Sequence, residues 1–261
     1  MTKHFLSFIS LVSLMLLSVI SCQKNPDGTP DTPDNPDNPG EIHPVPTEGV
    51  VDLGLSVLWT TRNVGAVKPT DFGSFFQWAG TLDVSNVGVY LYWNNCPHHT
   101  NDLECEKGWL KYCTIESYGE VDNKTVLEPI DDAAYMSPDG SKWCQRMPTL
   151  EEMGELMENC TWTLATIDDV KGYKVQSNIE GYTDNWIFLP TAGYRWLGEY
   201  TNNGDHTVYW TSSLSSDHPE IAWVLNCYEN QQFEEGFCVG PSIMPRFYGL
   251  PVRPVIEVKK D

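Results

Sequence analysis

The longest helical pattern in this chain is an apolar stripe that follows Thr149. The stripe recurs every three or four residues and predicts a helix over residues 149–160, with Leu150, Met153, Leu156, Met157 and Cys160 on one face. Thr149 and Glu152 have the spacing of a capping box, in which each side chain accepts a hydrogen bond from the backbone N–H of the other residue. One helix is therefore expected in the middle of the chain.

Short runs of β-branched and aromatic residues occur on both sides of this helix. Residues 161–166 and 172–177 flank Asp168-Asp169 and predict a hairpin. Further strands are predicted at 50–53, 57–61, 75–78, 187–189, 209–212, 222–228 and 252–258. Residues 80–145 show little periodicity, and we expect long loops pinned by disulfides there. The pattern predicts an α+β domain with few helices early and antiparallel strands late.

The first 46 residues have a different composition from the rest. An apolar run of 16 residues, Phe5–Ile20, follows the basic Lys3, and as a helix it would be about 24 Å long. Since a bilayer core is about 30 Å thick, the run predicts a secretory signal rather than a membrane span. Residues 23–45 are rich in Pro and Asp and predict a disordered linker. The expected parts are a signal at 1–21, a linker at 22–46 and a globular domain at 47–261.

The signal ends in Val19-Ile20-Ser21-Cys22, which resembles the lipobox of bacterial lipoproteins. The resemblance implies cleavage before Cys22, acylation of Cys22 and export to the outer membrane, with the lipid as the only membrane attachment. The Gln23-Lys24 start, with acids soon after, is also similar to the surface-export tag of Bacteroidota lipoproteins. The chain is therefore expected at the cell surface.

The acidic charge of the chain narrows the classes of partner. With 36 acidic against 16 basic residues, the net charge at pH 7 is −20. Such a surface repels phosphate groups, so no nucleic acid is expected as a partner. Ten Trp and twelve Tyr residues indicate a core of aromatic, β-rich packing.

Six blocks of residues occur in the order found in one known family. They are Val51–Trp59 with Asn63–Ala66, Asp122–Thr125 with Asp131–Ala134, Arg146–Thr149, Phe188–Arg195, Tyr209–Ser213 and Val252–Val255. In this order they resemble the Fibrobacter succinogenes major paralogous domain of exported Bacteroidota lipoproteins, which is similar to the Lcl C-terminal domains. The resemblance covers residues 50–256. It implies a single C-type-lectin-like domain, distantly similar to formylglycine-generating enzymes, and supplies no catalytic residues.

Seven cysteines follow Cys22, and an exported protein can keep disulfides. Cys160 is the expected free thiol, because it falls on the apolar stripe of the predicted helix. The favoured pairs are Cys96–Cys113, Cys105–Cys144 and Cys227–Cys238, although the sequence alone does not fix the connectivity.

No cluster in the sequence has the spacing of a catalytic or metal site. Cys96, His98, His99 and Cys105 lack the paired spacing of a zinc site. Ser212-Ser213 with Asp217-His218 lack the surroundings of a nucleophile elbow. The pairs Asp131-Asp132, Asp168-Asp169 and Glu234-Glu235 could supply oxygen ligands but lack a calcium-loop pattern. The presence of a structural calcium ion therefore stays an open alternative, and no other cofactor is expected. We expect no enzyme; the alternative is a metal-dependent enzyme of formylglycine-generating-enzyme-like fold that uses Cys227 and Cys238.

Two predicted loops combine aromatic rings with amide side chains. Residues 196–208 supply Trp196, Tyr200, Asn202 and Asn203, and residues 228–236 supply Tyr228, Gln231 and Gln232. Rings stack on apolar sugar faces, amides bond hydroxyls, and loops on a rigid scaffold are common binding sites. The sequence therefore predicts a non-catalytic binding or adhesion module for a glycan or protein ligand at the cell exterior. The alternative is a structural subunit that assembles with other envelope proteins.

Overall fold

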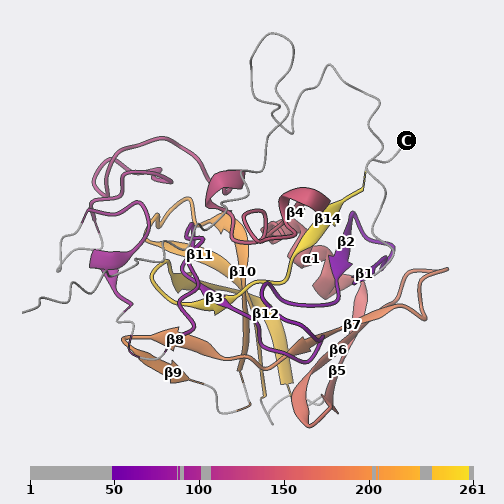
Figure 1. Cartoon of the computed structure of the whole chain (residues 1–261). Coiled ribbons are helices and arrows are strands. Elements are labelled where there is room, and N and C mark those ends of the chain that lie inside the picture. The colour runs from indigo at the N-terminus through magenta and orange to yellow at the C-terminus, as the bar shows by residue number, and fades with distance from the viewer. Residues whose placement is uncertain are drawn as a thin grey trace, which may run out of the picture. The chain divides into compact units, whose positions relative to one another are not determined.

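Antiparallel strands and a single α-helix make up most of the regular structure in the residues described by this computed structural model (Figure 1). These are residues 49–86, 88, 91–100, 107–201, 204, 206–229 and 237–258, all within one compact unit, Val45–Asp261. The predicted α+β class is therefore confirmed. The predicted signal and linker with Cys22 lie outside the described residues, as do Cys105, Asn202, Asn203, Gln231 and Gln232.

The central sheet has the strand order β10 (His206–Leu214), β11 (Ile221–Glu229) and β12 (Phe237–Pro245). Its two faces contact two different core clusters, because side chains alternate across a strand. Val208 and Trp210 belong to one cluster, and Tyr209 belongs to the other. Both faces of this sheet are therefore covered, which explains why nearly all of β10 is buried.

A second sheet consists of β5 (Cys160–Ile167), β6 (Val170–Ser177) and β7 (Trp186–Pro190). The predicted hairpin is confirmed, because Ile167 pairs with Val170 across Asp168 and Asp169. Both Asp residues have positive φ angles, 50° and 62°, as a two-residue hairpin turn requires. The turn therefore accounts for this acidic pair.

The remaining strands join parts of the chain that are far apart in sequence. One sheet has the order β1 (Val50–Val51), β2 (Val57–Thr60), β14 (Val255–Glu257) and β4 (Gln145–Arg146). Two smaller pairs are β3 (Phe75–Phe76) with β13 (Leu250–Pro251), and β8 (Tyr194–Trp196) with β9 (Glu199–Thr201). In Figure 1 the β5–β7 sheet lies at the lower right of the central sheet and the β8–β9 hairpin at its lower left.

The region between β3 and β4 is irregular, as predicted, and contains only short 3-10 helices where it is described. These are η1 (Trp93–Asn95), η2 (Pro129–Asp131) and η3 (Ser141–Trp143). Within the described residues, every helix falls short of the length and apolar character that crossing a bilayer needs.

The predicted helix is confirmed as α1 (Leu150–Glu158). Its capping box is formed: the backbone N–H of Glu152 donates to Thr149 Oγ1 at 3.2 Å, and that of Thr149 donates to Glu152 Oε2 at 2.8 Å. The prediction is wrong at Cys160, which begins β5 instead of ending the helix. Its side chain is still buried, in the same core cluster as Met153 and Leu156.

Glu152 also forms an ion pair that makes stability depend on pH. Its two carboxylate oxygens accept hydrogen bonds from the guanidinium of Arg146, at 2.6 and 2.7 Å. Burial alone would raise the pKa of Glu152, but the bonds from Arg146 and Thr149 lower it below the usual 4.5. An acid with a lowered pKa stabilises the fold above its usual pKa, and this contribution is lost as the pH falls through the lowered value.

Glu152→Gln is therefore expected to lower the free energy of unfolding by about 1–3 kcal/mol near neutral pH, because a charged hydrogen-bonded pair is lost. The difference between the two proteins should shrink as the pH falls below the usual glutamate pKa. Urea unfolding of both proteins at neutral pH and in acid measures this difference. An equal difference under the two conditions would contradict the ion pair's contribution.

Carboxylates that accept main-chain hydrogen bonds hold the described part of the region between β3 and β4. Asp132 is 3% exposed and accepts three backbone N–H bonds, from Ala134, Tyr135 and Met147, at distances from 2.8 to 3.3 Å. Burial raises the pKa of Asp132 to about 6, although these bonds oppose the rise. Asp122 accepts three more backbone N–H bonds in the same region.

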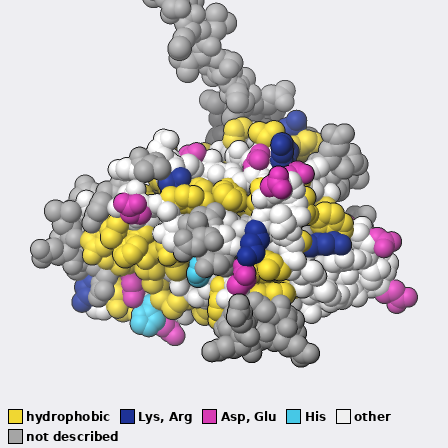
Figure 2. Space-filling model, turned by 90° about the horizontal axis from the view of Figure 1, so that it is seen from below, with side chains coloured by type: hydrophobic (Ala, Val, Ile, Leu, Met, Phe, Trp, Pro, Cys, Tyr) yellow, Lys and Arg dark blue, Asp and Glu magenta, His cyan; other side chains and the backbone are white. Residues whose placement is uncertain are grey.

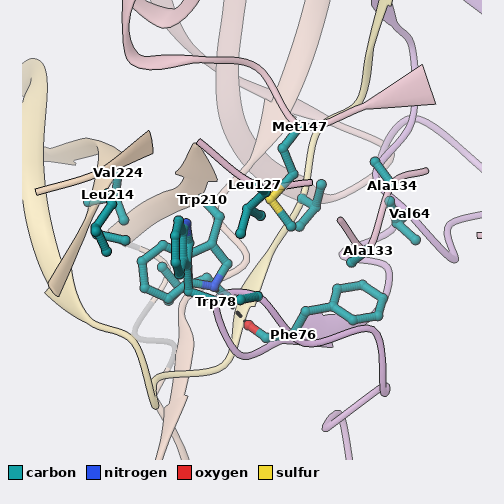
Figure 3. Close-up of a cluster of buried hydrophobic side chains, with 14 of the residues drawn as sticks. Val64, Phe76, Trp78, Leu127, Ala133, Ala134, Met147, Trp210, Leu214 and Val224 are labelled. Carbon is teal, nitrogen blue, oxygen red and sulfur yellow. Dashed lines mark hydrogen bonds between the residues drawn. The ribbon is translucent and has the colours of Figure 1, made fainter. Parts of the chain in front are cut away.

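The core beside this region is built on two buried indoles (Figure 3). Trp78 and Trp210 are fully buried in one cluster with Phe76 and Met147. The indole N–H of Trp210 donates to Phe76 O at 2.8 Å, and that of Trp78 donates to Thr211 O at 2.9 Å. Because a buried indole needs such a partner, the two bonds fix β3 against β10.

Arg253, between β13 and β14, is 1% exposed and joins three other segments. Its Nε donates to Asn63 Oδ1 at 2.8 Å, its Nη1 to Thr60 O at 3.1 Å and its Nη2 to Phe188 O at 2.8 Å. Burial lowers the pKa of Arg253 to about 10, so the guanidinium remains charged at neutral pH. The side chain thus connects the C-terminal segment with β2 and β7.

Candidate functional site

Aromatic rings from four separate segments form a continuous series, which we call the aromatic platform. The Trp196 ring stacks on the Tyr248 ring, with a centroid distance of 5.6 Å and an interplanar angle of 10°. Tyr194 lies 5.7 Å from Tyr248, His206 lies 6.4 Å from Tyr194, and Tyr228 lies 6.5 Å from His206. The platform consists of these five rings.

A second row of rings meets the platform at Tyr248. Phe247 lies 5.0 Å from Tyr248 between ring centroids, and Trp93 and Tyr92 lie 4.5 and 5.3 Å from Phe247. Phe247 is buried, whereas Tyr92 and Trp93 are half-buried. The aromatic surface therefore continues from the β8–β9 hairpin toward η1.

The backbone holds the β8–β9 hairpin against the segment that follows β12. Arg195 and Gly249 exchange two main-chain hydrogen bonds, at 2.8 and 3.0 Å. A Cβ atom at Gly249 would lie 3.2 Å from the Cβ of Arg195 and 2.9 Å from a methyl group of Val84, so a side chain there would force the two segments apart. This close approach places Tyr248 next to Trp196.

The platform is accessible to a ligand. Trp196 is 39% exposed, and the other four rings are half-buried. Figure 2 shows apolar side chains gathered on the face seen from below, the side on which β8 and β9 lie in Figure 1. Because the rings already pack against one another, they lose little conformational freedom when a ligand binds.

No family model, curated protein or solved structure matches this chain. The family resemblance of the six sequence blocks and its lectin-like fold therefore stay predictions. The polar side chains of those blocks have a clear structural use. Arg146, Asp132 and Arg253 bond to carboxylates, amides or main-chain groups inside the protein.

Two of the seven predicted ligand-binding residues, Trp196 and Tyr228, lie in the platform. Tyr200 lies outside it: its ring packs on Phe75 at 5.7 Å, and its hydroxyl donates to Ala192 O at 2.8 Å. Its position therefore does not favour the predicted stacking role. The four predicted amides, Asn202, Asn203, Gln231 and Gln232, lie outside the described residues.

The sequence prediction misses Tyr194 and Tyr248 and gives His206 no role as a stacking ring. One signal was available, because Tyr194 and Trp196 are two residues apart and share a face once 194–196 is a strand. Tyr248 had no such signal. It reaches Trp196 only through the long-range pairing of Arg195 with Gly249.

Ser212 and Ser213, which the sequence places near Asp217 and His218, form structural hydrogen bonds. The backbone N–H of Leu150 donates to Ser213 Oγ at 3.0 Å, and Ser212 Oγ donates to Pro148 O at 3.4 Å. His218 lies 3.3 Å from a carboxylate oxygen of Glu220 rather than next to either serine. These contacts hold the start of α1 against β10 and do not assemble a nucleophile with a base.

The residues weighed as metal ligands in the sequence form contacts with other protein groups where they are described. His98 Nε2 lies 2.9 Å from Asp131 Oδ1, and Asp131 Oδ2 accepts from Tyr112 Oη at 2.6 Å and Lys111 Nζ at 2.5 Å. His99 is buried with its ring 4.7 Å from that of Trp109. Among the described residues there is no group of three or more His, Cys, Asp or Glu side chains placed to hold one metal ion.

The cysteines that the structure describes are free thiols: Cys96, Cys113, Cys144, Cys160, Cys227 and Cys238. None of the predicted disulfides is present among them. Cys144 is exposed, and its predicted partner Cys105 lies outside the described residues.

The strand register does not favour the predicted Cys227–Cys238 pair. Cys227 is opposite Val239, and Cys238 is opposite Tyr228. Opposite residues share a face of a sheet and neighbours along a strand do not, so the two thiols lie on different faces. Burial also raises the pKa of Cys227 well above its usual value, whereas a catalytic thiol needs a lowered one.

A hollow of about 260 Å³ lies between β2 and η3 and is lined in part by Arg62, Asn63, Asp139 and Trp143. The Asn63 amide is already bonded to Arg253, to Phe72 O and to Tyr209 Oη. Asn63, a buried polar residue of this hollow, therefore already has its hydrogen-bond partners within the protein. The aromatic platform is the stronger candidate site.

Proposed function

We propose that this chain is a lipid-anchored binding module of the cell surface, with a lectin-like fold, that holds a neutral glycan on the aromatic platform. The anchor is supported by the sequence around Cys22. The ligand class is supported by the stacked, exposed Trp196 and the four rings that continue from it. This preformed surface of five aromatic rings is the observation on which the proposal depends.

Aromatic rings suit a sugar for a physical reason. The ring face is apolar and electron-rich, and the C–H groups on one face of a pyranose pack against it. Tyr and His also carry polar atoms at the ring edge, where sugar hydroxyls would lie. Tyr194, Tyr228 and Tyr248 each supply a hydroxyl, and His206 supplies two ring nitrogens.

The charge of the protein selects among glycans. A net charge of −20 creates a negative potential that opposes the approach of sulfated or carboxylated sugars. A neutral glycan meets no such barrier. The proposed ligand is therefore a neutral saccharide whose rings have an apolar face.

Trp196→Ala is the central test of this function. Loss of a stacking indole is expected to weaken glycan binding at least tenfold, or about 1.4 kcal/mol. The soluble domain is first screened on an array of neutral and acidic glycans, and the Kd of the best neutral ligand is then measured by calorimetry. Tyr248→Ala should weaken binding similarly, whereas Tyr248→Phe, which keeps the ring, should retain most of it.

Trp186→Ala is the matched control. Trp186 is 40% exposed, almost the same as Trp196, but it lies on β7 and contacts Lys174 instead of the platform. This variant should bind as the original protein does. The function is contradicted if the folded domain binds no glycan, or if the two Trp variants lose affinity equally. A concentration-dependent oligomer unaffected by Trp196→Ala would favour the assembly subunit instead.

A further inference from the structure

Two cysteines share a small buried cluster beside the platform. Cys96 and Cys113 pack with Trp109 and Phe247, and their exposed fractions are 6% and 0%. Phe247 is the ring that links Tyr248 of the platform to Trp93 and Tyr92. The thiols therefore lie beneath the aromatic surface, on two segments separated by seventeen positions in sequence.

A buried cation lies next to both thiols. The guanidinium of Arg246 is fully buried and lies 3.7 Å from the Trp109 ring centroid and 4.8 Å from that of Trp78. Burial lowers the pKa of Arg246 to about 10, and negative charge at Cys96, Tyr112, Cys113 or Asp122 raises it. One guanidinium is thus within electrostatic reach of both sulfur atoms.

Arg246 lacks a carboxylate partner in the described structure. Its Nη atoms donate to the carbonyl oxygens of Tyr112, Pro219 and Lys111, and its Nε has no hydrogen-bond partner. None of the ion pairs among the described residues includes it. A buried cation without a bonded carboxylate favours negative charge nearby. Asp122 supplies some of this charge, and a thiolate at Cys96 or Cys113 would add to it.

We propose that Cys96 and Cys113 are a disulfide site that closes in an oxidising compartment, in the buried cluster beside Arg246. The thiolate of one cysteine attacks the disulfide of a protein dithiol–disulfide oxidant and releases one oxidant thiolate. The second cysteine loses its proton and displaces the oxidant sulfur from this mixed disulfide. In total, two protons leave the cysteines and two electrons pass to the oxidant, which becomes a dithiol.

The remaining described cysteines lack this arrangement. Cys227 and Cys238 lie on different faces of a sheet, and Cys144 is exposed. Burial raises the pKa of Cys96 to about 12 despite the charge of Arg246. The exchange therefore belongs to a state in which the η1 segment is open, before folding is complete, and the closed bridge is afterwards shielded from reductant.

Disulfide mapping of the protein exported into an oxidising compartment tests this site. Free thiols are alkylated under denaturing conditions, and cleavage after Glu104 then separates Cys96 from Cys105. We expect a reductant-sensitive cross-linked peptide that contains Cys96 and Cys113. Recovery of both cysteines as alkylated peptides, or of either one joined to Cys105, would overturn the proposal.

Thermal unfolding gives a second readout. A bridge that closes a loop of this length is expected to raise Tm by about 6–12 °C in a domain of this size. Reduction should remove this increase, and the double variant Cys96→Ser, Cys113→Ser should show no change on reduction. Cys160→Ser, which removes another buried free thiol, should keep the full shift. Neither result depends on whether a glycan binds the platform.

Discussion

Arg253→Met is expected to leave the domain unfolded or insoluble. The side chain of Arg253 is buried and donates to three acceptors, Asn63 Oδ1, Thr60 O and Phe188 O. Methionine fills a similar volume but removes the guanidinium donor from all three acceptors, and each buried group left unsatisfied costs about 1–3 kcal/mol. The expected loss of more than about 4 kcal/mol is comparable to the whole stability of many domains.

Arg253→Lys tests whether a positive charge at this position is sufficient without the planar guanidinium group. Lysine keeps the positive charge, but a single ammonium group cannot reach three acceptors that match the planar guanidinium fork. We expect Arg253→Lys to be destabilised by about 2–4 kcal/mol in urea unfolding. Arg62→Met is the control, because Arg62 is exposed and makes one described bond, to Val67 O. A variant at Arg253 as stable as the Arg62 variant would contradict this structural role.

Asp132→Asn is expected to lower the free energy of unfolding by about 2–4 kcal/mol. Both oxygens of Asp132 accept backbone N–H bonds, two at Oδ1 and one at Oδ2. An amide of the same shape must direct its NH₂ group at one of these donors, so a buried backbone N–H loses its acceptor. Unfolding is compared well above the pKa of about 6 that burial gives Asp132, where the carboxylate is ionised.

Asp139→Asn is the matched control for this change. Asp139 lies in the same irregular region, is exposed and has no described side-chain hydrogen bond. Its replacement should change the stability by less than about 0.5 kcal/mol. The account of Asp132 fails if the two variants unfold at the same urea concentration.

These two predictions bear on how the sequence blocks are used. Asp132, Arg146 and Arg253 all belong to the six sequence blocks, and all are bonded inside the protein. Such residues preserve a fold without specifying a ligand. The aromatic platform draws only Tyr194 from those blocks, so binding specificity can change while the scaffold stays the same.

The sequence correctly predicted the elements that are specified by residues close to one another in the chain. The capping box of Thr149 and Glu152 and the Asp168-Asp169 turn depend on neighbours in the chain, and both are confirmed. β12 was missed because Gly240, Pro241 and Pro245 obscure its alternation. Its strand structure depends on pairing with β11 along its whole length.

The sequence by itself determined the helix, the β5–β6 hairpin and the α+β class, because hydrophobic period and turn chemistry are local properties of the chain. Only the tertiary structure decided which rings form the platform and which faces carry Cys227 and Cys238. Those outcomes depend on strand register and on the approach of segments such as Arg195 and Gly249. Register and approach are set by the packing of the whole core, which no short stretch of residues encodes.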